Sequence, residues 1–441
     1  MSKSDNDTGD HERLGLWGAV SIGVGGMVGG GIFAVLGLSV DLAAGGAPVA
    51  FALAGVVAAL TATSYARLSV DHPSSGGTIT FLNSAFGPGE LSGGLNVLLW
   101  LSYVIMLALY ASAFGNYFAT TVVSGNPPWW LSHLALSGVV VTLTALNAAS
   151  ASAVGRAEEV LVIVKIVILV VFVAAGLTVV EPGRLAVGEW APPLSLVGGG
   201  MLIFVAYEGF ELIANAADDV EDAERVLPRA FAISVGGVAL LYILVAVVTV
   251  GVLTLPEIRS AQDFALAEAA RPRFGQAGFT VIGIAAVLST ASALNATLYG
   301  ATRLTFSVAR SGELPAPFAR RLRGGVSEGL LITSALTLVL ANTVALERIS
   351  TAGSAGFLII FCAVNIARVR LAGDGERSAL AVIGAVACAV ALAALLVQAA
   401  TNDWVAAAMS VTLVGVAFGA ELAYRRWRPA RPQAQRPTPG A

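Results

Sequence analysis

Long apolar segments recur along the whole chain, and they constrain its fold more than any other feature. Each is long enough to cross roughly 30 Å of hydrocarbon as a helix of about 20 residues, and we count about twelve of them. They begin near Leu14, Pro48, Ser92, Leu131, Ala157, Leu194, Arg229, Ala277, Gly329, Ser350, Ser378 and Trp404. Of the 441 residues only 12% are charged, against about 25% in soluble domains. The sequence therefore predicts an all-α integral membrane protein.

Positive residues divide unevenly between the two ends of these segments. If the N-terminus is inside, most of the 25 lysines and arginines fall in inner connections. The outer connections hold Arg184, Arg259, Arg271, Arg273 and Arg348. Such a bias places both termini in the cytoplasm. We therefore expect a multi-pass protein of the cytoplasmic membrane, with a cytoplasmic N-terminal tail (1–13) and a basic, Pro-rich cytoplasmic tail (426–441).

The residues that carry most enzyme chemistry are scarce. Cys362 and Cys388 lie inside apolar segments, and His11, His72 and His133 are scattered. This pattern contains no zinc motif, disulfide framework or nucleophile with its base. We expect no metal site, no cofactor and no nucleic-acid partner, and a membrane-embedded enzyme or a channel is less favoured than a transporter.

Glycines crowd the first segment, AVSIGVGGMVGGGIFAVLG. They are Gly23, Gly25, Gly26, Gly29, Gly30 and Gly31. Each interior glycine costs a helix about 0.5–1 kcal/mol relative to alanine. Close packing of helices is the alternative explanation for such a run. Because the run is denser than packing requires, we predict a break in this helix.

The sixth segment, VGGGMLIFVAYEGFELIANAADDVEDAERVLPRA, is interrupted at Gly198–Gly200 and again at Gly209. Glu208 and Glu211 flank the second interruption. Irregular backbone at membrane depth is tolerated only where it is buried in protein or lines a cavity. Interrupted segments at equivalent places in two halves of a chain indicate a transporter binding site. Segments one and six are equivalent if segments one to five and six to ten form inverted repeats.

A single lysine lies inside the apolar stretch VLVIVKIVILVV, Val160 to Val171. Lys165 is the only lysine besides Lys3. A charge near the bilayer centre costs at least about 2.5–3.5 kcal/mol and usually faces the protein interior with a partner. Snorkelling toward the headgroups is the alternative. Unlike arginine, a buried lysine can lose its proton, so we predict a protonatable group inside the protein.

Several motifs occur in an order typical of one family. They are GGMVGGGIF, HPSSGGTITFLNSAFG, VGRAEEVLVIVKIVILVVF, FVAYEGFE with LPRA after it, and ATRLTFSVARSGELP. They resemble the amino acid, polyamine and organocation (APC) superfamily, most closely its archaeal proton-coupled amino acid permeases, and the resemblance runs from about Leu14 to Arg370. The resemblance implies a LeuT-like core of two inverted five-helix repeats over residues 14–371, with helices one and six broken. Two accessory helices over 372–425 would follow.

The resemblance also implies where an amino acid would bind. In the family, backbone N–H groups of the unwound first helix hold the α-carboxylate, which corresponds to Gly29, Gly30 and Gly31. A half-helix N-terminus is a ready anion site, which agrees with this assignment. Carbonyl groups of helix six hold the α-amino group. These carbonyls correspond to the region of Phe204, Val205 and Tyr207, with Phe204 or Tyr207 as an aromatic lid.

In proton-coupled members of the family, a lysine of helix five takes the place of a sodium ion. Lys165 matches that lysine, and its implied partners are the Gly25 carbonyl and the hydroxyl of Ser289 or Ser292. The coupled ion would then be a proton and not sodium. Glu208 and Glu211 are rival proton carriers, with Glu211 ranked higher for gating, and the alternative is that both are solvated at the inner vestibule.

These observations predict a secondary transporter that imports amino acids by alternating access, driven by the proton gradient. A polyamine or cationic amino acid carrier or exchanger is the alternative, because Glu208 could pair with a second positive group on the substrate. The sequence leaves open whether the protein is a monomer or a homodimer.

Overall fold

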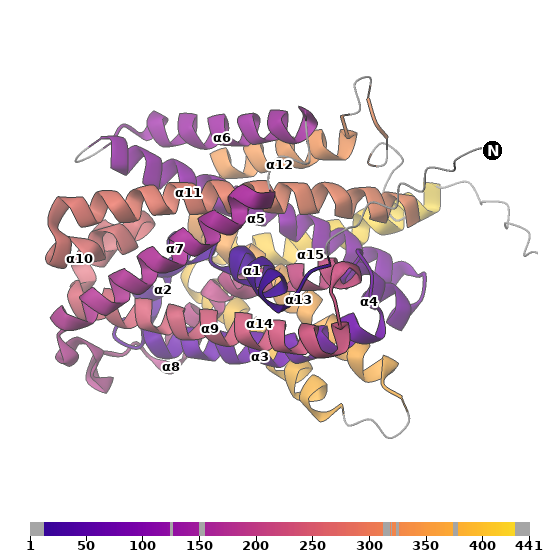
Figure 1. Cartoon of the computed structure of the whole chain (residues 1–441), viewed down its shortest axis with the longest axis horizontal. Coiled ribbons are helices and arrows are strands. Elements are labelled where there is room, and N and C mark those ends of the chain that lie inside the picture. Colours follow the sequence, from indigo (N-terminus) through magenta and orange to yellow (C-terminus); the bar gives the residue numbers. More distant parts are fainter. Residues whose placement is uncertain are drawn as a thin grey trace, which may run out of the picture.

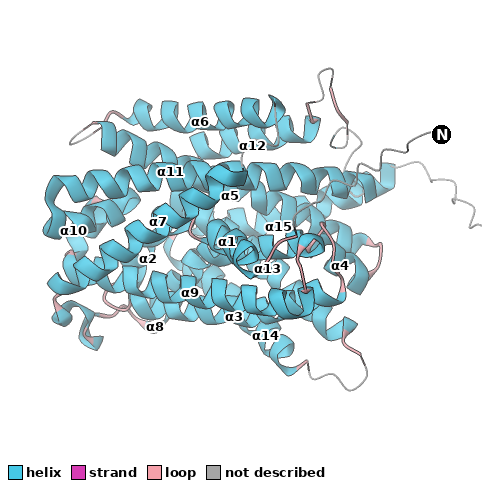
Figure 2. Ribbon diagram, in the orientation of Figure 1, coloured by secondary structure: helices cyan, strands magenta, loops and turns pink. Residues whose placement is uncertain are grey.

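The computed structural model describes residues 13–123, 127–149, 155–311, 318, 320–322, 326–373 and 378–427. Within these ranges the chain is almost entirely helical and forms no named strand (Figure 2). The predicted tails fall almost wholly outside the described residues: only Arg13 of the first and residues 426–427 of the second lie within them.

The helices include ten that are long and apolar enough to cross a membrane within the described ranges. The α-helices are α1 (Leu16–Met27), α2 (Gly31–Ala43), α3 (Ala47–Asp71), α4 (Thr78–Phe86), α5 (Glu90–Val122), α6 (Trp129–Ala149), α7 (Gly155–Gly176), α8 (Pro193–Leu202), α9 (Ala223–Val252), α10 (Leu255–Ser260), α11 (Ala265–Ser311), α12 (Glu328–Thr343), α13 (Leu346–Leu371), α14 (Ala379–Asn402) and α15 (Trp404–Trp427). Short 3₁₀ helices are η1 (Leu177–Val179), η2 (Pro182–Leu185), η3 (Val187–Glu189) and η5 (Gln262–Phe264), and η4 (Ile203–Asp219) is long. Figure 1 shows α3, α9 and α11 running along the longest axis, with α6 beside α12 at one edge. The predicted total of about twelve spans depends on the bent pair α1–α2 and on α12, which has only 16 residues.

The first apolar segment is broken, as its glycines predict. Helix α1 ends at Met27, helix α2 begins at Gly31, and the two are bent by 47°. Close packing applies as well, because a Cβ atom on Gly26 would lie 2.7 Å from the carbonyl oxygen of Gly209. The glycines of this segment therefore serve both purposes that the sequence leaves open.

The sixth segment passes from an α-helix to a 3₁₀ helix without a sharp bend, whereas the sequence predicts a broken helix here. Gly198–Gly200 lie inside the regular helix α8, and a Cβ atom on Gly200 would lie 2.5 Å from the Ala50 carbonyl oxygen. These glycines therefore permit close packing, and the interruption predicted there is wrong. After Leu202 the chain continues as the 17-residue 3₁₀ helix η4, whereas 3₁₀ runs rarely exceed about 3–4 residues.

Two serines of α13 stabilise the point where α8 gives way to η4. Ser350 and Ser354 each donate a hydrogen bond of 2.9 Å to the Leu202 carbonyl oxygen. The Val205 N–H donates in turn to Ser354 Oγ at 3.0 Å. Side-chain hydroxyls thus satisfy backbone groups near a change of helix type, as irregular backbone at membrane depth requires.

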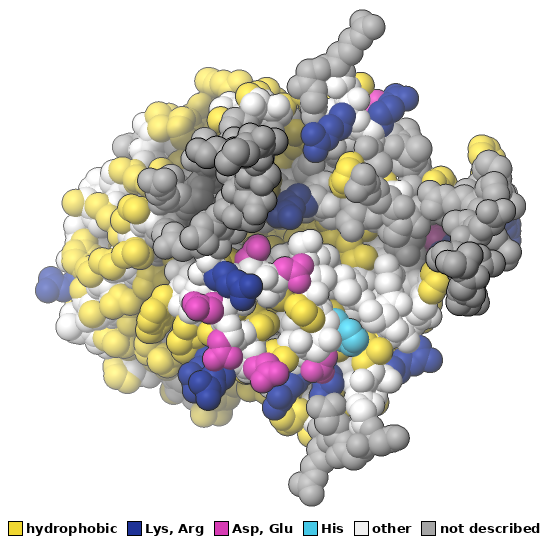
Figure 3. All heavy atoms as spheres, turned by 45° about the vertical axis from the view of Figure 1, so that its right-hand side comes forward, with side chains coloured by type: hydrophobic (Ala, Val, Ile, Leu, Met, Phe, Trp, Pro, Cys, Tyr) yellow, Lys and Arg dark blue, Asp and Glu magenta, His cyan; other side chains and the backbone are white. Residues whose placement is uncertain are grey.

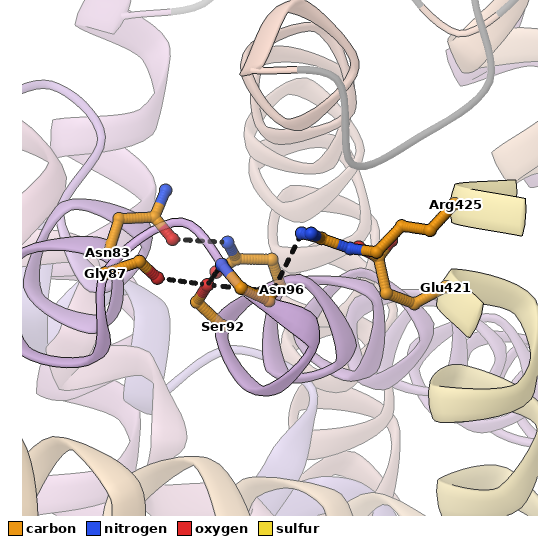
Figure 4. A network of polar contacts seen from close by, with 7 residues as sticks. Asn83, Gly87, Ser92, Asn96, Glu421 and Arg425 are labelled. Carbon is orange, nitrogen blue, oxygen red and sulfur yellow. Dashed lines mark hydrogen bonds and ion pairs between the residues drawn. The ribbon is translucent and has the colours of Figure 1, made fainter. Parts of the chain in front are cut away.

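The last helix, α15, is attached to the α4–α5 corner by an arginine that a buried carboxylate holds in place (Figure 4). Glu421 is 1% exposed and forms an ion pair with Arg425. Arg425 Nη2 also donates to the Gly89 carbonyl oxygen at 2.8 Å. The same corner is closed by Ser92, whose hydroxyl donates to the Gly87 carbonyl oxygen at 2.6 Å. The accessory helix is therefore bonded to the core.

A second ion pair lies at the α14–α15 junction. Arg348 Nε donates to Asp403 Oδ2 at 2.6 Å. This hydrogen bond from the guanidinium lowers the pKa of the Asp403 carboxyl below its usual value. The pair connects α13 to the accessory helices. Asp403 directly precedes α15 and Glu421 lies near the C-terminal end of this helix, so the two ion pairs lie at its opposite ends.

Charged and apolar side chains occupy different parts of the surface. Figure 3 shows a broad area of hydrophobic side chains beside a face where Asp, Glu, Lys, Arg and His gather. Helix α7 illustrates the apolar part, because Ile163, Val167 and Val170 are more than half exposed. A helix with an exposed apolar face is expected where lipid, and not water, is the surrounding solvent.

Candidate functional site

The α1–α2 break forms a backbone surface that excludes side chains. Gly30 is the N-cap residue of α2, and its carbonyl oxygen accepts from the Ala34 N–H at 2.9 Å. A Cβ atom on Gly29 would lie 2.5 Å from Ala293 Cβ, and one on Gly30 would lie 2.2 Å from Tyr110 Cδ1. The first N–H groups of a helix have no partner within it and attract negative charge. The N-terminus of α2 therefore has the chemistry of an anion site.

The backbones of α1 and η4 touch where they cross. A Cβ atom on Gly209 would lie 2.2 Å from the Gly26 carbonyl carbon and 2.4 Å from the Met27 nitrogen. Tyr242 of α9 covers this crossing, since its hydroxyl donates to the Met27 carbonyl oxygen at 2.6 Å and to the Ala206 carbonyl oxygen at 3.4 Å. The two irregular segments thus meet at one place, although they are far apart in sequence.

The helix-six residues predicted to hold an amino group are all fully buried. Tyr207 donates its hydroxyl to the Phe51 carbonyl oxygen at 3.0 Å. The Phe204 ring lies 5.7 Å from the Phe361 ring, edge to face. Gly31 is close by, because a Cβ atom there would lie 2.7 Å from Ala206. The anion site on α2 and the η4 backbone are therefore neighbours, whereas a lid role for either aromatic ring stays a prediction.

Glu208 is buried beside the break with half of its carboxylate unpaired. The side chain is 3% exposed, and Tyr110 donates to Oε1 over a long 3.4 Å. Oε2 has no hydrogen-bond partner among the described residues. Tyr110 is also the ring that contacts Gly30. Since a buried, unpaired carboxylate oxygen is costly, this position is suited to a cation or a proton.

Glu211 is buried and fully hydrogen-bonded. It is 0% exposed; Tyr103 donates to Oε1 at 2.6 Å, and Tyr65 and Thr78 each donate to Oε2 at 3.1 Å. These donors come from α5, α3 and α4, so one carboxylate joins three helices to η4. The alternative that Glu208 and Glu211 are solvated at an inner vestibule is wrong, because both side chains are buried.

Lys165 is buried and bonded to the first helix. Its side chain is 3% exposed, which excludes snorkelling, and Nζ donates to the Gly25 carbonyl oxygen at 3.0 Å. Lys165 lines a cavity of about 210 Å³ between α7 and α11. Ser289 lines this cavity too, but its hydroxyl makes no hydrogen bond within the described structure. Ser292 is half-buried and does not line this cavity. Of the three implied partners, the structure therefore brings Gly25 to the lysine and places Ser289 nearby.

A larger cavity, of about 390 Å³, leads from the N-terminal end of α1 to the break. Its walls include Leu14 at one end, Gly25 and Gly26 at the other, and Tyr103 and Asn215 between the helices. The volume lies in the range of small-molecule sites. Sequence reasoning missed the tyrosines of this region. A buried tyrosine hydroxyl needs a partner, so a tyrosine inside an apolar segment was the available signal.

A comparison with known families identifies the family of the chain. The model of a family described as amino acid permease matches residues 14–419. The chain belongs to the amino acid permease family. This permease is 36% identical over 422 residues to an uncharacterized protein of Methanocaldococcus jannaschii, covering 94% of this chain and 96% of that one. It is 36% identical over 383 residues to the inner membrane transport protein YbaT of Escherichia coli, covering 86% and 88%.

A solved structure gives the fold of the permease independently. The manganese transporter of Eremococcus coleocola has 13% sequence identity and a TM-score of 0.57, and the match covers 96% of both chains. At this identity the likeness shows the fold alone. The predicted class, an all-α transporter of the APC superfamily that passes through the membrane several times, is confirmed, while the total of twelve helices and the inverted repeat stay predictions.

Proposed function

We propose that the permease imports amino acids across the cytoplasmic membrane by alternating access, coupled to protons, with both termini in the cytoplasm. The family description supports the substrate class. The hydrogen bond from Lys165 to the Gly25 carbonyl oxygen carries the coupling proposal, because it puts a titratable cation on the broken helix.

An amino acid would bind between α2 and η4. Its carboxylate would accept from the N–H groups at Gly29, Gly30 and Gly31, because the first N–H groups of α2 have no partner within the helix. Its ammonium group would face backbone carbonyls of η4 near Phe204 and Val205. Charges of opposite sign at the two ends of the site select a zwitterion over an ion with a single charge.

Protonation of Lys165 would set the position of α1. The charged ammonium binds the Gly25 carbonyl oxygen strongly, whereas the neutral amine is a weaker donor. Gly25 also lines the 390 Å³ cavity, so release of this bond changes a wall of the route to the break. Coupling requires that the two states of the transporter differ in proton affinity, and loss of this bond in the second state would supply such a difference.

Uptake into proteoliposomes tests the proposal. Purified permease is reconstituted and given labelled amino acids under an inward proton gradient and, separately, an inward sodium gradient. We expect accumulation under the proton gradient alone, abolished by a protonophore and absent from protein-free vesicles. A requirement for sodium would contradict proton coupling, and no amino acid uptake under either gradient would contradict the proposed substrate class.

Glu208 favours a second candidate, a carrier of cationic amino acids or polyamines. Its unpaired Oε2 atom could pair with a second ammonium group. In that case Glu208→Gln lowers the apparent affinity for lysine or putrescine at least about tenfold, or about 1.4 kcal/mol, and leaves that for leucine unchanged. Competition against one labelled substrate measures this, with exposed Glu224→Gln as the control. Equal effects on leucine and lysine would contradict the second candidate.

A further inference from the structure

A groove of about 680 Å³ runs between α3, α9 and α14, away from the α1–η4 crossing. Most of its walls are small or apolar. Its lining includes Ala62 and Ala66 on α3, Phe231 and Val235 on α9, and the arginines Arg67 and Arg368. It shares none of these residues with the cavity that reaches the α1–α2 break. The groove is therefore separate from the proposed substrate site.

Small and apolar residues form the base of the groove. Ala62 and Ala66 on α3, and Phe231 and Val235 on α9, are buried at its base, while Ala232 is exposed at its rim. Helices α3, α9 and α14 are all candidate membrane spans, so an exposed rim between them would be in contact with lipid. A groove of this kind, with small residues along α3 and an apolar base, has the shape and polarity to hold an acyl chain.

Two arginines lie at one end of the groove. Arg67 is exposed and forms no ion pair with another described residue. Arg368 is largely buried and held in place, because Nη1 donates to Asp71 Oδ2 at 3.1 Å. Asp71 itself does not line the groove, and the charged residues that do line it are both arginines. By the distribution of positive residues, this is the predicted cytoplasmic end.

We infer that the groove binds an anionic phospholipid of the cytoplasmic leaflet. Its phosphate lies at Arg67 and Arg368, and one acyl chain lies between α3 and α9. Planar guanidinium groups match phosphate oxygens in pairs, and basic pockets between spans on the cytoplasmic side are suited to anionic headgroups. The apolar walls require a lipid and not free phosphate, because most of the cavity offers nothing to a small anion.

Native mass spectrometry of the purified, full-length permease tests the inference. Delipidated protein is titrated with phosphatidylglycerol or with phosphatidylcholine of the same acyl chains, and retained lipid is counted. We expect phosphatidylglycerol to be retained and to raise the thermal unfolding midpoint, with phosphatidylcholine at least about tenfold weaker. Equal retention of both lipids would overturn the inference, as would equal protection by soluble glycerol phosphate.

Two variants separate the headgroup from the acyl chain. Arg67→Gln removes a charge at the exposed end of the groove, and Ala232→Trp fills the groove from an exposed position without changing charge. Each is expected to lower phosphatidylglycerol retention about tenfold or more. Arg426→Gln, an exposed arginine on α15 outside the groove, is the matched control and leaves retention unchanged. Wild-type retention in both groove variants, or an equal loss in the control, would contradict the site.

Discussion

Lys165→Ala is expected to abolish proton-driven accumulation of substrate while binding is retained. The substitution removes the 3.0 Å hydrogen bond from Nζ to the Gly25 carbonyl oxygen and the group whose protonation would bias α1. With one coupled proton, a pH difference of one unit supports roughly tenfold accumulation, since tenfold corresponds to about 1.4 kcal/mol. In the variant, the ratio of inside to outside substrate falls to about one, as equilibration without coupling requires. Accumulation of labelled substrate in proteoliposomes measures this ratio.

Two further variants show whether the proton or the positive charge matters. Lys165→Arg keeps a charged donor that does not lose its proton, so it is expected to bind substrate and exchange it without accumulation. Val164→Ala, at an exposed neighbouring position, is the control and keeps coupling. Substrate counterflow establishes that each variant is folded and active. Full accumulation by Lys165→Ala would refute the role of the lysine and shift attention to the buried carboxylates.

The sequence was most informative where the chemistry of a residue restricts where its side chain can lie. A lysine inside an apolar span must be buried with a partner or reach the surface, and the prediction of burial is confirmed for Lys165. Glycine has two uses at membrane depth, to break a helix or to let another helix approach. Gly29 and Gly30 lie at a break, whereas Gly200 lies in a regular helix against Ala50. The local sequence of the two glycine runs does not separate these uses.

Partners from distant helices could not be predicted, because nothing near a residue in sequence specifies them. Glu211 receives hydrogen bonds from Tyr65, Thr78 and Tyr103, which come from other helices. From the sequence alone, in which these donors cannot be identified, a solvated carboxylate is an equally good interpretation. The same applies to Ser354, which satisfies backbone groups of the sixth segment from α13. The glycines of the first segment, Gly209 and Lys165 therefore pointed to the position of the candidate site, but its hydrogen-bond network was not predictable.

Gly209→Ala is expected to cause a large loss of folded permease. Its Cβ atom would lie 2.2 Å from the Gly26 carbonyl carbon and 2.4 Å from the Met27 nitrogen. Both contacts are to backbone, so no side chain can turn away, and α1 and η4 must separate. Overpacking of a buried contact typically costs about 1–3 kcal/mol, and separation also disturbs the Tyr242 hydrogen bond to the Met27 carbonyl oxygen. The thermal unfolding midpoint in detergent and the monodisperse yield measure the loss.

Gly237→Ala is the matched control for this prediction. It also adds one methyl group to a helical glycine, but a Cβ atom on Gly237 would meet nothing within 4 Å. Because alanine favours a helix over glycine by about 0.5–1 kcal/mol, this variant is expected to be at least as stable as the wild type. Equal stability and uptake in the two variants would mean that the α1–η4 crossing can open by the width of a methyl group. The direct backbone contact would then be dispensable, and the break between α1 and α2 would be specified by the glycines of the first segment and not by the approach of η4.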